Sequence, residues 1–372
     1  MIRFLFIGLI AFLIVFLEKK LFEYWWDSGL NIELSFSKSQ IHMDEPGILS
    51  QSVENNKFLP LPSLCVKFLT ARGIEFENSL GSNTTDNYYR NDIYQVKGNE
   101  KITRSLSFQG GKRGYYTIRE ATLIASDFML SGHYIKNVPV NTHIYILPRL
   151  SRLKVLDNLY KKINETGLIL RQYPPDPFEF AGIRDYMPYD DHRFINWKAT
   201  SKSEDLKVNH TTNTRNRSVN ILLLLSLKSL RFNEEISEEC ISVAATYLTR
   251  FQKDGFGVGL ISDHINNHTG KGVIFAPFGG KEHLNEIMRN LACLDLNKPD
   301  ESFTHDRIQD LLKGQDDLII ISPDVDPKLS ELIKERIKGG KNSFWIVPFL
   351  HGCVPQIPKG CEFFIKAVNA EI

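Results

Sequence analysis

The chain has 372 residues, of which 42% are hydrophobic and 24% are charged, so it can bury a substantial core and is not disordered as a whole. Its 45 Lys and Arg residues against 44 Asp and Glu residues leave a formal charge of +1, which does not favour nucleic acid as a partner. The five cysteines are odd in number, scattered and never spaced as CxxC. This pattern argues against a disulfide framework and a zinc ribbon, and it favours a reducing compartment.

The N-terminal segment is strongly apolar, because Phe4–Leu17 contains no charged or polar side chain. A membrane span needs about 20 apolar residues, and this run can just cross if the flanking Arg3, Lys19 and Lys20 reach the headgroups. Aromatic residues up to Trp26 would suit the interface. We therefore predict a membrane anchor and flank at residues 1–26, with a single N-terminal pass in the cell membrane and a cytoplasmic body. A signal-peptide core and a buried soluble helix are the alternatives.

Residues 31–147 have the pattern of short β-strands. Apolar and polar residues alternate from Ile32 to Phe36, and turn signals such as Glu45–Gly47 and Gly110–Gly111 separate the later strand candidates. Many short strands with few helical patterns predict a β-sandwich domain at 31–147. A connecting segment follows at 148–217, where Pro174 and Pro175 exclude a continuous helix.

The pattern changes at residue 218. The apolar run Ile221–Leu225 is typical of a strand buried on both faces, and a helix is predicted from Glu234 to Lys253. Further strands and helices alternate to residue 347. This alternation predicts an α/β doubly wound parallel sheet over 218–372, so the predicted fold class is mixed: an N-terminal membrane helix, a β-sandwich and this sheet.

The densest concentration of functional side chains lies in the connecting segment, in FEFAGIRDYMPYDDHRFINWKAT at residues 178–200, followed by LKV at 206–208. This segment resembles the domain-of-unknown-function 58 family, whose signature is EFxG(L/I)RxYxPGDxxRxIxWKx(S/T) and then LxV. Upstream, Lys112–Tyr116 and Ser126–Phe128 resemble further elements of the family. The matching candidate contact residues are Glu179, Arg184, Tyr186, Asp190, Asp191, Arg193, Asn196, Trp197 and Lys198.

The resemblance implies a bacterial protein that is anchored in a membrane, usually by a pair of spans, and that carries a β domain and a von Willebrand factor A-like domain. Such proteins often accompany a MoxR-type AAA+ ATPase, and no biochemical activity is established as a family property. This chain departs from the family in two ways. It has one apolar run, and Tyr189 stands where the family usually has Gly.

The motif supports two interpretations. Its carboxylates and its two arginines can form paired charges, so the motif can act as a clasp that joins the β domain to the α/β domain, with Trp197 in a packed site. Alternatively, the same residues contact a ligand or a partner. A catalytic carboxylate pair is the weakest interpretation, because no nucleophile or metal cluster accompanies it.

A metal site of the adhesion type is not predicted. That site needs Asp-x-Ser-x-Ser after the first strand, whereas Leu224 or Leu225 occupies the Asp position here, and Ser226 and Ser229 are expected to be hydrogen-bonding loop residues. Asp324 alone is a weak site. His264 and His268 lie in a sequence typical of a loop, so we expect solvated histidines, and we predict no cofactor.

Taken together, the sequence predicts a membrane-anchored, non-catalytic interaction or scaffold protein whose partner is a protein such as a MoxR-type AAA+ ATPase. Two alternatives stay open. One is a metal-dependent extracellular adhesion or ligand-binding protein, and the other is a hydrolase with an unrecognised site.

Overall fold

The computed structural model describes residues 2–71, 73–77, 83–84, 87–151, 157, 160–161, 180–187, 192–203, 205–211, 218–226, 234–312, 318–339, 343–350 and 362–368. The chain forms two compact units. The first comprises Met1–Arg149 with the short segments Asn267–Thr269 and Met288–Leu294, and the second comprises Leu150–Asn266, Gly270–Ile287 and Asp295–Ile372.

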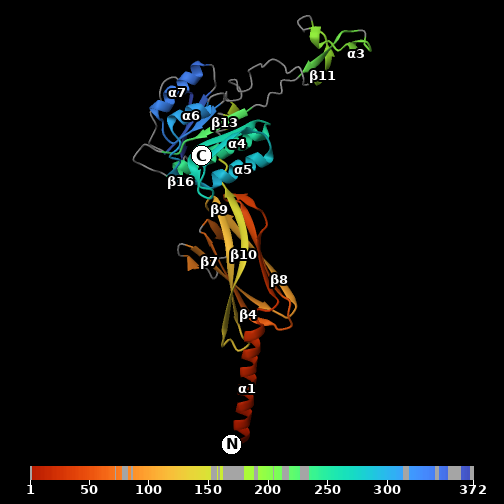
Figure 1. Ribbon diagram of the computed structural model, residues 1–372, viewed down its shortest axis with the longest axis vertical. Helices are drawn as coiled ribbons and strands as arrows, with labels where there is room; N and C mark the ends of the chain where they lie inside the picture. Colours follow the sequence, from red (N-terminus) through yellow and green to blue (C-terminus); the bar gives the residue numbers. More distant parts are fainter. Residues whose placement is uncertain are drawn as a thin grey trace. The chain divides into compact units, whose positions relative to one another are not determined.

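The first unit is a sandwich of two sheets (Figure 1). One sheet has the strand order β1-β3-β8-β5, and the other has the order β2-β10-β9-β4-β7-β6. Within the described residues of this unit, the strand pairings are antiparallel except that of β2 with β10. The strands are β1 (Leu30–Phe36), β2 (Gln40–His42), β3 (Pro46–Asn55), β4 (Leu61–Ala71), β5 (Ile74–Phe76), β6 (Asn83–Thr84), β7 (Asn87–Val96), β8 (Glu100–Gly110), β9 (Gly114–Ser126) and β10 (His133–Leu147).

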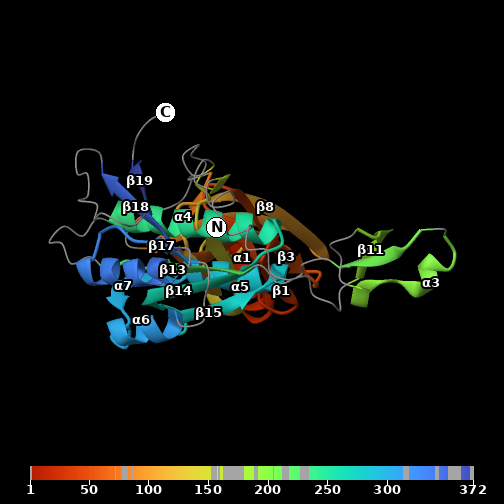
Figure 2. The same cartoon turned by 90° about the horizontal axis from the view of Figure 1, so that it is seen from above.

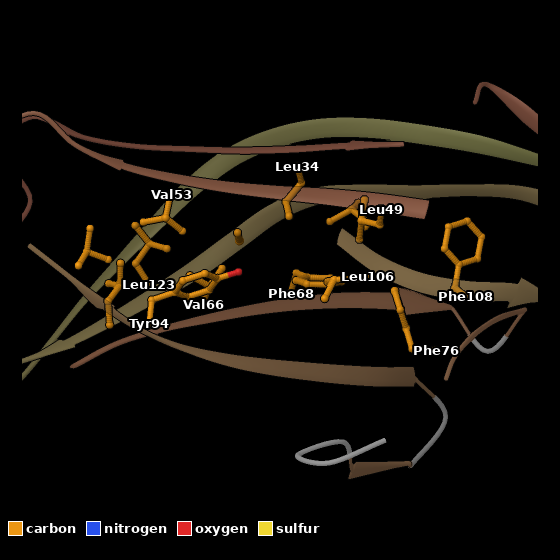
Figure 3. Close-up of a cluster of buried hydrophobic side chains, with 14 of the residues drawn as sticks. Leu34, Leu49, Val53, Val66, Phe68, Phe76, Tyr94, Leu106, Phe108 and Leu123 are labelled. Atoms are coloured by element: carbon orange, nitrogen blue, oxygen red, sulfur yellow. The ribbon is translucent and has the colours of Figure 1, made fainter. Parts of the chain in front are cut away.

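The core of the sandwich follows from the alternation of the strands. Because successive side chains point to opposite faces, every second residue of β3 is buried, including Leu49 and Val53. Figure 3 shows these side chains facing Val66 and Phe68 of the opposite sheet, with Tyr94 in the same layer. The predicted sandwich at 31–147 therefore has a single apolar core between its two sheets.

Helix α1 (Ile2–Trp25) ends against this core. Phe22 and Trp26 are buried, and their rings lie 5.3 and 6.2 Å from the ring of Tyr134. Asp27, just after the helix, forms a 2.9 Å ion pair with Lys136 of β10. The expectation that Trp26 lies among lipid headgroups is therefore wrong, because its ring is part of the sandwich core.

The predicted membrane pass is also wrong: among the described residues, no helix combines the length and the apolar character that crossing a membrane requires. The uncharged run Phe4–Leu17 is bounded by Arg3 and Glu18. At about 1.5 Å per residue it rises about 21 Å, less than a hydrocarbon core of about 30 Å. The predicted location in the cell membrane, which rested on this pass, is not supported.

The two upstream family elements have structural roles within the first unit. The carboxylate of Asp127 accepts hydrogen bonds from the backbone N and the hydroxyl of Ser131, at 2.7 and 2.9 Å, and so closes the turn between β9 and β10. Phe128 then packs edge-on against Phe22 of α1. Arg113 places Nη1 2.9–3.0 Å from three carbonyl oxygens of the segment 288–294 that belongs to this unit, those of Leu291, Ala292 and Leu294.

The second unit contains a seven-stranded sheet with the order β15-β14-β13-β17-β18-β19, and β16 pairs with β14. Strands β13, β14, β17, β18 and β19 are mutually parallel. The strands are β13 (Ser218–Leu223), β14 (Gly257–Asn266), β15 (Gly272–Phe278), β16 (Leu294–Pro299), β17 (Leu318–Ile321), β18 (Ser343–Leu350) and β19 (Glu362–Val368). The helices between them are α4 (Glu234–Lys253), α5 (Lys281–Ala292), α6 (His305–Leu312) and α7 (Pro327–Lys338).

Helix α4 runs along this sheet and contacts several of its strands (Figure 2). An apolar stripe along the helix provides the contact, because Cys240, Val243, Tyr247 and Phe251 are all buried. A separate cluster joins Leu329 and Ile333 of α7 to the strand residues Leu318, Ile320 and Trp345.

The predicted fold class is wrong as a whole. The described body is mostly β-sheet, and it has neither the membrane helix nor the purely parallel, doubly wound sheet of von Willebrand factor A type that the pattern suggested. The largest sheet is mixed, because β15 pairs with β14 in the antiparallel direction. The cause is the turn at 267–271, which is too short for the crossover that parallel strands need. The sequence prediction assigned the residues around His264 and His268 to a loop and so missed β15, whereas β14 continues to Asn266.

Candidate functional site

The motif forms a small folded module, here called the motif module, which consists of residues 180–187, 192–203 and 205–211. Its strands β11 (Phe180–Asp185) and β12 (Lys207–Thr211) pair antiparallel, and Ile195 adds a single bridge to Val208. The 3-10 turn η2 (His192–Phe194) and the one-turn helix α3 (Trp197–Thr200) lie between the strands. Figure 1 shows this module in green.

Asn196 organises the module. Its side-chain oxygen accepts a 2.9 Å hydrogen bond from the backbone N of Ala199, so it is the N-cap of α3. Its amide Nδ2 donates to Oδ1 of Asn209 at 2.7 Å, and its backbone N donates to the carbonyl of Lys207 at 2.8 Å. The hydroxyl of Thr200 accepts from the backbone N of Lys207 at 3.0 Å. These four bonds fix the single turn of helix against β12.

The side chain of Trp197 lies on the surface of the motif module. Trp197 is the first residue of α3, and its side chain is 68% exposed. The clasp interpretation requires a packed site around Trp197, and that requirement is not met. The role of Trp197 as a contact residue stays a prediction, and the exposed ring favours it, because a large exposed aromatic on an ordered element is typical of binding surfaces. The next residue, Lys198, is also exposed.

The remaining described motif residues stabilise the module or lie on its surface. Tyr186 stacks on His192 with ring centroids 5.8 Å apart, and Arg184 donates from Nη1 to the carbonyl of Asp185 at 3.0 Å. Arg193 is exposed in η2. Glu179, Asp190, Asp191 and Tyr189 lie outside the described residues, so the structure does not address the predicted charge pairs that involve them.

The sequence prediction missed one ion pair of the module. Lys207 and Asp185 face each other across the β11–β12 ladder and form an ion pair. The hydrogen bond from Lys207 to Asp185 raises the pKa of the lysine above its usual value. Opposite charges at opposing positions of two paired strands are the signal that could have found it, once the hairpin register is known.

A second concentration of polar groups lies at the carboxyl edge of the large sheet, where β13 and β14 end. The carboxylate of Asp263 accepts hydrogen bonds from the backbone N of Leu225 and of Ser226, both at 2.9 Å, and from Nδ1 of His264 at 2.7 Å. Burial alone raises the pKa of Asp263, but these hydrogen bonds outweigh burial and hold the pKa below its usual value.

At the same edge of the sheet, the prediction for His264 is wrong, and the prediction that no metal is bound stays untested. His264 is buried in β14, so the expectation of a solvated loop histidine is wrong for it, whereas His268 is exposed. Ser226 is hydrogen-bonded through its backbone N, and Ser229 lies outside the described residues. Over the described part of the chain, no cluster of three acidic, histidine or cysteine side chains is arranged to hold a metal ion. The prediction that the protein binds no metal therefore stays a prediction.

At the carboxyl end of β17, polar side chains also form hydrogen bonds within the protein. The hydroxyl of Ser322 donates to the carbonyl of Asp324 at 2.6 Å and accepts a 2.8 Å hydrogen bond from the indole of the buried Trp345. The carboxylate of Asp324 accepts from the backbone N of Val325 at 2.8 Å. The polar side chains of this edge therefore satisfy the protein's own backbone and side chains.

Comparison with known proteins supports the family resemblance. A family model described as "Protein of unknown function DUF58" matches residues 182–341, which include the motif from Gly182 onward. The chain is also similar to the uncharacterized protein YeaD of Bacillus subtilis (strain 168), with 28% identity over 120 residues. That match covers 32% of this chain and 27% of YeaD, so the chain spans about a quarter of the length of the curated relative it matches. These matches do not extend to the von Willebrand factor A-like fold or to the AAA+ association.

Solved structures resemble about a third of the chain at low overall similarity. A non-cellulosomal cohesin from Archaeoglobus fulgidus is 11% identical, with 32% of this chain and 91% of that chain covered and a TM-score of 0.23. A type II cohesin domain from the cellulosome of Acetivibrio cellulolyticus is 9% identical, with 32% and 94% covered and a TM-score of 0.22. The CARDB domain of the PF1109 protein from Pyrococcus furiosus is 12% identical, with 31% and 90% covered and a TM-score of 0.20.

Proposed function

We propose that this protein is a non-catalytic interaction protein that binds a protein partner through the motif module, and that the partner is an AAA+ ATPase of the MoxR type. The observation that carries the proposal is Trp197, which is 68% exposed at the start of a helical turn that four hydrogen bonds hold in place. The resemblance of the motif to the domain-of-unknown-function 58 family supplies the class of partner.

The rigidity of the turn supports a binding role. An exposed aromatic side chain on a mobile segment loses conformational freedom when it binds, whereas a side chain on an ordered turn loses less. Tryptophan is also among the residues whose truncation costs the most binding energy in protein interfaces. The two residues therefore have different roles: Asn196 stabilises the turn, and Trp197 provides the exposed apolar surface.

One carboxylate–imidazole pair among the described residues has a structural role. Asp263 and His264 are an adjacent carboxylate and imidazole, as a general base and its orienting acid would be. Both carboxylate oxygens, however, accept from backbone N–H groups of the loop after β13. This pair therefore stabilises the sheet edge.

The test is binding of the purified full-length chain to the MoxR-type AAA+ ATPase of the same organism, measured by chemical crosslinking with and without ATP. We expect Trp197→Ala to weaken binding by about thirtyfold or more, as for a central aromatic contact. Phe58→Ala is the matched control, because Phe58 is 89% exposed and belongs to the first unit. Equal crosslinking of wild type and Trp197→Ala would reject the motif module as the binding surface.

A further inference from the structure

We infer that the outer face of the six-stranded sheet is an interface between two copies of this chain. The inference goes beyond the proposed function, because it concerns the first unit and does not depend on the motif module. It rests on an apolar row that crosses four neighbouring strands of this sheet, formed by Ile135 of β10, Ile124 of β9, Cys65 of β4 and Ile93 of β7.

The strand register places these four side chains next to one another. Ile124 is opposite Ile135 on one side and opposite Cys65 on the other, and Cys65 is in turn opposite Ile93. Opposed residues of antiparallel strands point to the same face, with Cβ atoms about 5 Å apart. Val66, the next residue of β4, points into the sandwich core, so the row lies on the outer face. Its two ends are solvent-exposed, because Ile135 is 66% and Ile93 is 65% exposed.

The row matches a second copy of itself. Two sheets that pack face to face keep their strands roughly aligned and lie about 10 Å apart. A two-fold axis that runs along the strands, between β4 and β9, places β4 over the partner's β9 and β7 over the partner's β10. Ile93 then faces the partner's Ile135, and Cys65 faces the partner's Ile124. One arrangement therefore covers the whole apolar row of both copies.

The charges beside the row are complementary between two copies. Among the outward positions of the central strands, at 63–69 of β4 and 120–126 of β9, the charged residues are Lys67 and Glu120, and neither forms an ion pair within the described residues. Lys67 is opposite Thr122 in its own sheet, so the two-fold axis places it over the partner's Thr122. The partner's Glu120 is the next outward position along that strand. Two opposite-charge pairs therefore form across the interface, and no like charges face each other.

The size of this face suits a weak dimer. It presents four strands with four outward positions each, or about 16 residues per copy. An interface that buries about 800 Å² per partner uses about 20–30 residues a side, so this face would bury about 500 Å² per copy and about 1,000 Å² in total. That total is at the lower limit for a specific interface, so we expect a reversible dimer with a dissociation constant in the micromolar range.

The experiment measures sedimentation equilibrium of the full-length protein over the micromolar concentration range. We expect a monomer–dimer equilibrium for wild type. The double variant Ile93→Lys with Ile135→Lys should weaken the dimer about tenfold or more, because each new lysine would face a lysine of the partner. The matched control is Ile48→Lys, which should associate as wild type does, because Ile48 is 44% exposed on the outer face of the other sheet. Circular dichroism verifies that each variant is folded.

A charge swap tests the arrangement of the two copies. Lys67→Glu and Glu120→Lys should each weaken the dimer about fivefold, because each dimer contains two such pairs. The double swap should associate as wild type does, since both pairs form again with their charges exchanged. A wild type that stays monomeric, unchanged association in the double isoleucine variant, or equal weakening in Ile48→Lys would overturn the inference. Failure of the double swap to restore association would reject the two-fold arrangement.

Discussion

Trp345 and Trp197 belong to the same unit and have opposite surroundings. Trp345 lies in β18, is 1% exposed, and donates its indole N–H to Ser322 at the carboxyl edge of the large sheet. Trp197 begins α3 and is 68% exposed. At the sheet edge, polar side chains form hydrogen bonds with the backbone and with the indole of Trp345. In the motif module, hydrogen bonds instead stabilise a turn whose tryptophan is exposed to solvent. The contrast supports the proposal that the module binds a partner, and it assigns a structural role to the polar side chains of the sheet edge.

The largest expected effect separates the two tryptophans by stability. Trp345→Ala should lower the free energy of unfolding by about 3–5 kcal/mol, because it empties a packed site and removes the hydrogen bond from the indole to the Ser322 hydroxyl. Trp197→Ala should change it by no more than about 0.5 kcal/mol, as for an exposed side chain. Urea unfolding followed by circular dichroism measures both. A loss of several kcal/mol in Trp197→Ala would restore the packed clasp interpretation.

A second variant tests the role of the buried carboxylate. Asp263→Ala should lower the free energy of unfolding by about 3 kcal/mol, because it leaves the N–H groups of Leu225 and Ser226 and the ring of His264 without their acceptor. Asp324→Ala at the same edge is the control and should cost about 1 kcal/mol, since it removes a single hydrogen bond to Val325. Equal losses in the two variants would contradict the assignment of Asp263 as the main anchor of this edge.

The titration of Asp263 should make the free energy of unfolding depend on pH in the acidic range. Its pKa is lowered in the folded protein, so around pH 4 the unfolded chain binds more protons than the folded chain. The contribution of Asp263 is therefore fully present above the unfolded pKa of about 3.9 and is lost as pH falls through the folded pKa. The difference in unfolding free energy between wild type and Asp263→Asn should narrow below about pH 4. A difference that stays constant from pH 6 to pH 2 would show that Asp263 does not titrate in this way.

The smallest expected effect concerns the frame of the module. Asn196→Ala removes the cap of α3 and should destabilise the turn by about 1 kcal/mol, with faster hydrogen exchange at the backbone N of Ala199. If α3 must be ordered to bind, partner binding should weaken about fivefold although Trp197 is intact. Asn209→Ala is the control, because it removes one hydrogen bond to Asn196 and leaves the cap. Unchanged exchange in Asn196→Ala would show that other bonds suffice to hold the turn.

Several elements could be predicted because their signals are local. The alternation of apolar and polar residues from Ile32 to Phe36 predicted the strand β1, and the spacing of Cys240, Val243 and Tyr247 is typical of the helix that was predicted at α4. The motif resemblance located the module and named Asn196 and Trp197 among its residues. Each of these predictions follows from a period or from an ordered run of residues within one segment.

Other features could not be predicted, because they depend on residues far apart in the chain. Asp263 is an ordinary carboxylate in sequence, and its partners Leu225 and Ser226 lie 38 and 37 positions away. The length of β14 and the antiparallel edge strand β15 were missed because polar residues of the buried strand end resemble a loop. The apolar run at the N-terminus predicted a membrane pass, but the charged residues Arg3 and Glu18 bound the run and leave it shorter than a membrane span.

The sequence by itself determined that residues 31–147 form short strands, that a helix begins at Glu234, and that the segment 178–200 concentrates functional side chains, because hydrophobic periodicity and motif order are local properties of the sequence. Only the tertiary structure decided that Trp197 faces solvent while Trp345 is buried, and that Asp263 serves the backbone of a distant loop. The physical reason is that the exposure of a side chain and the choice of its hydrogen-bond partner depend on which other segments of the chain pack against it. The packing of sheets and turns determines which segments meet.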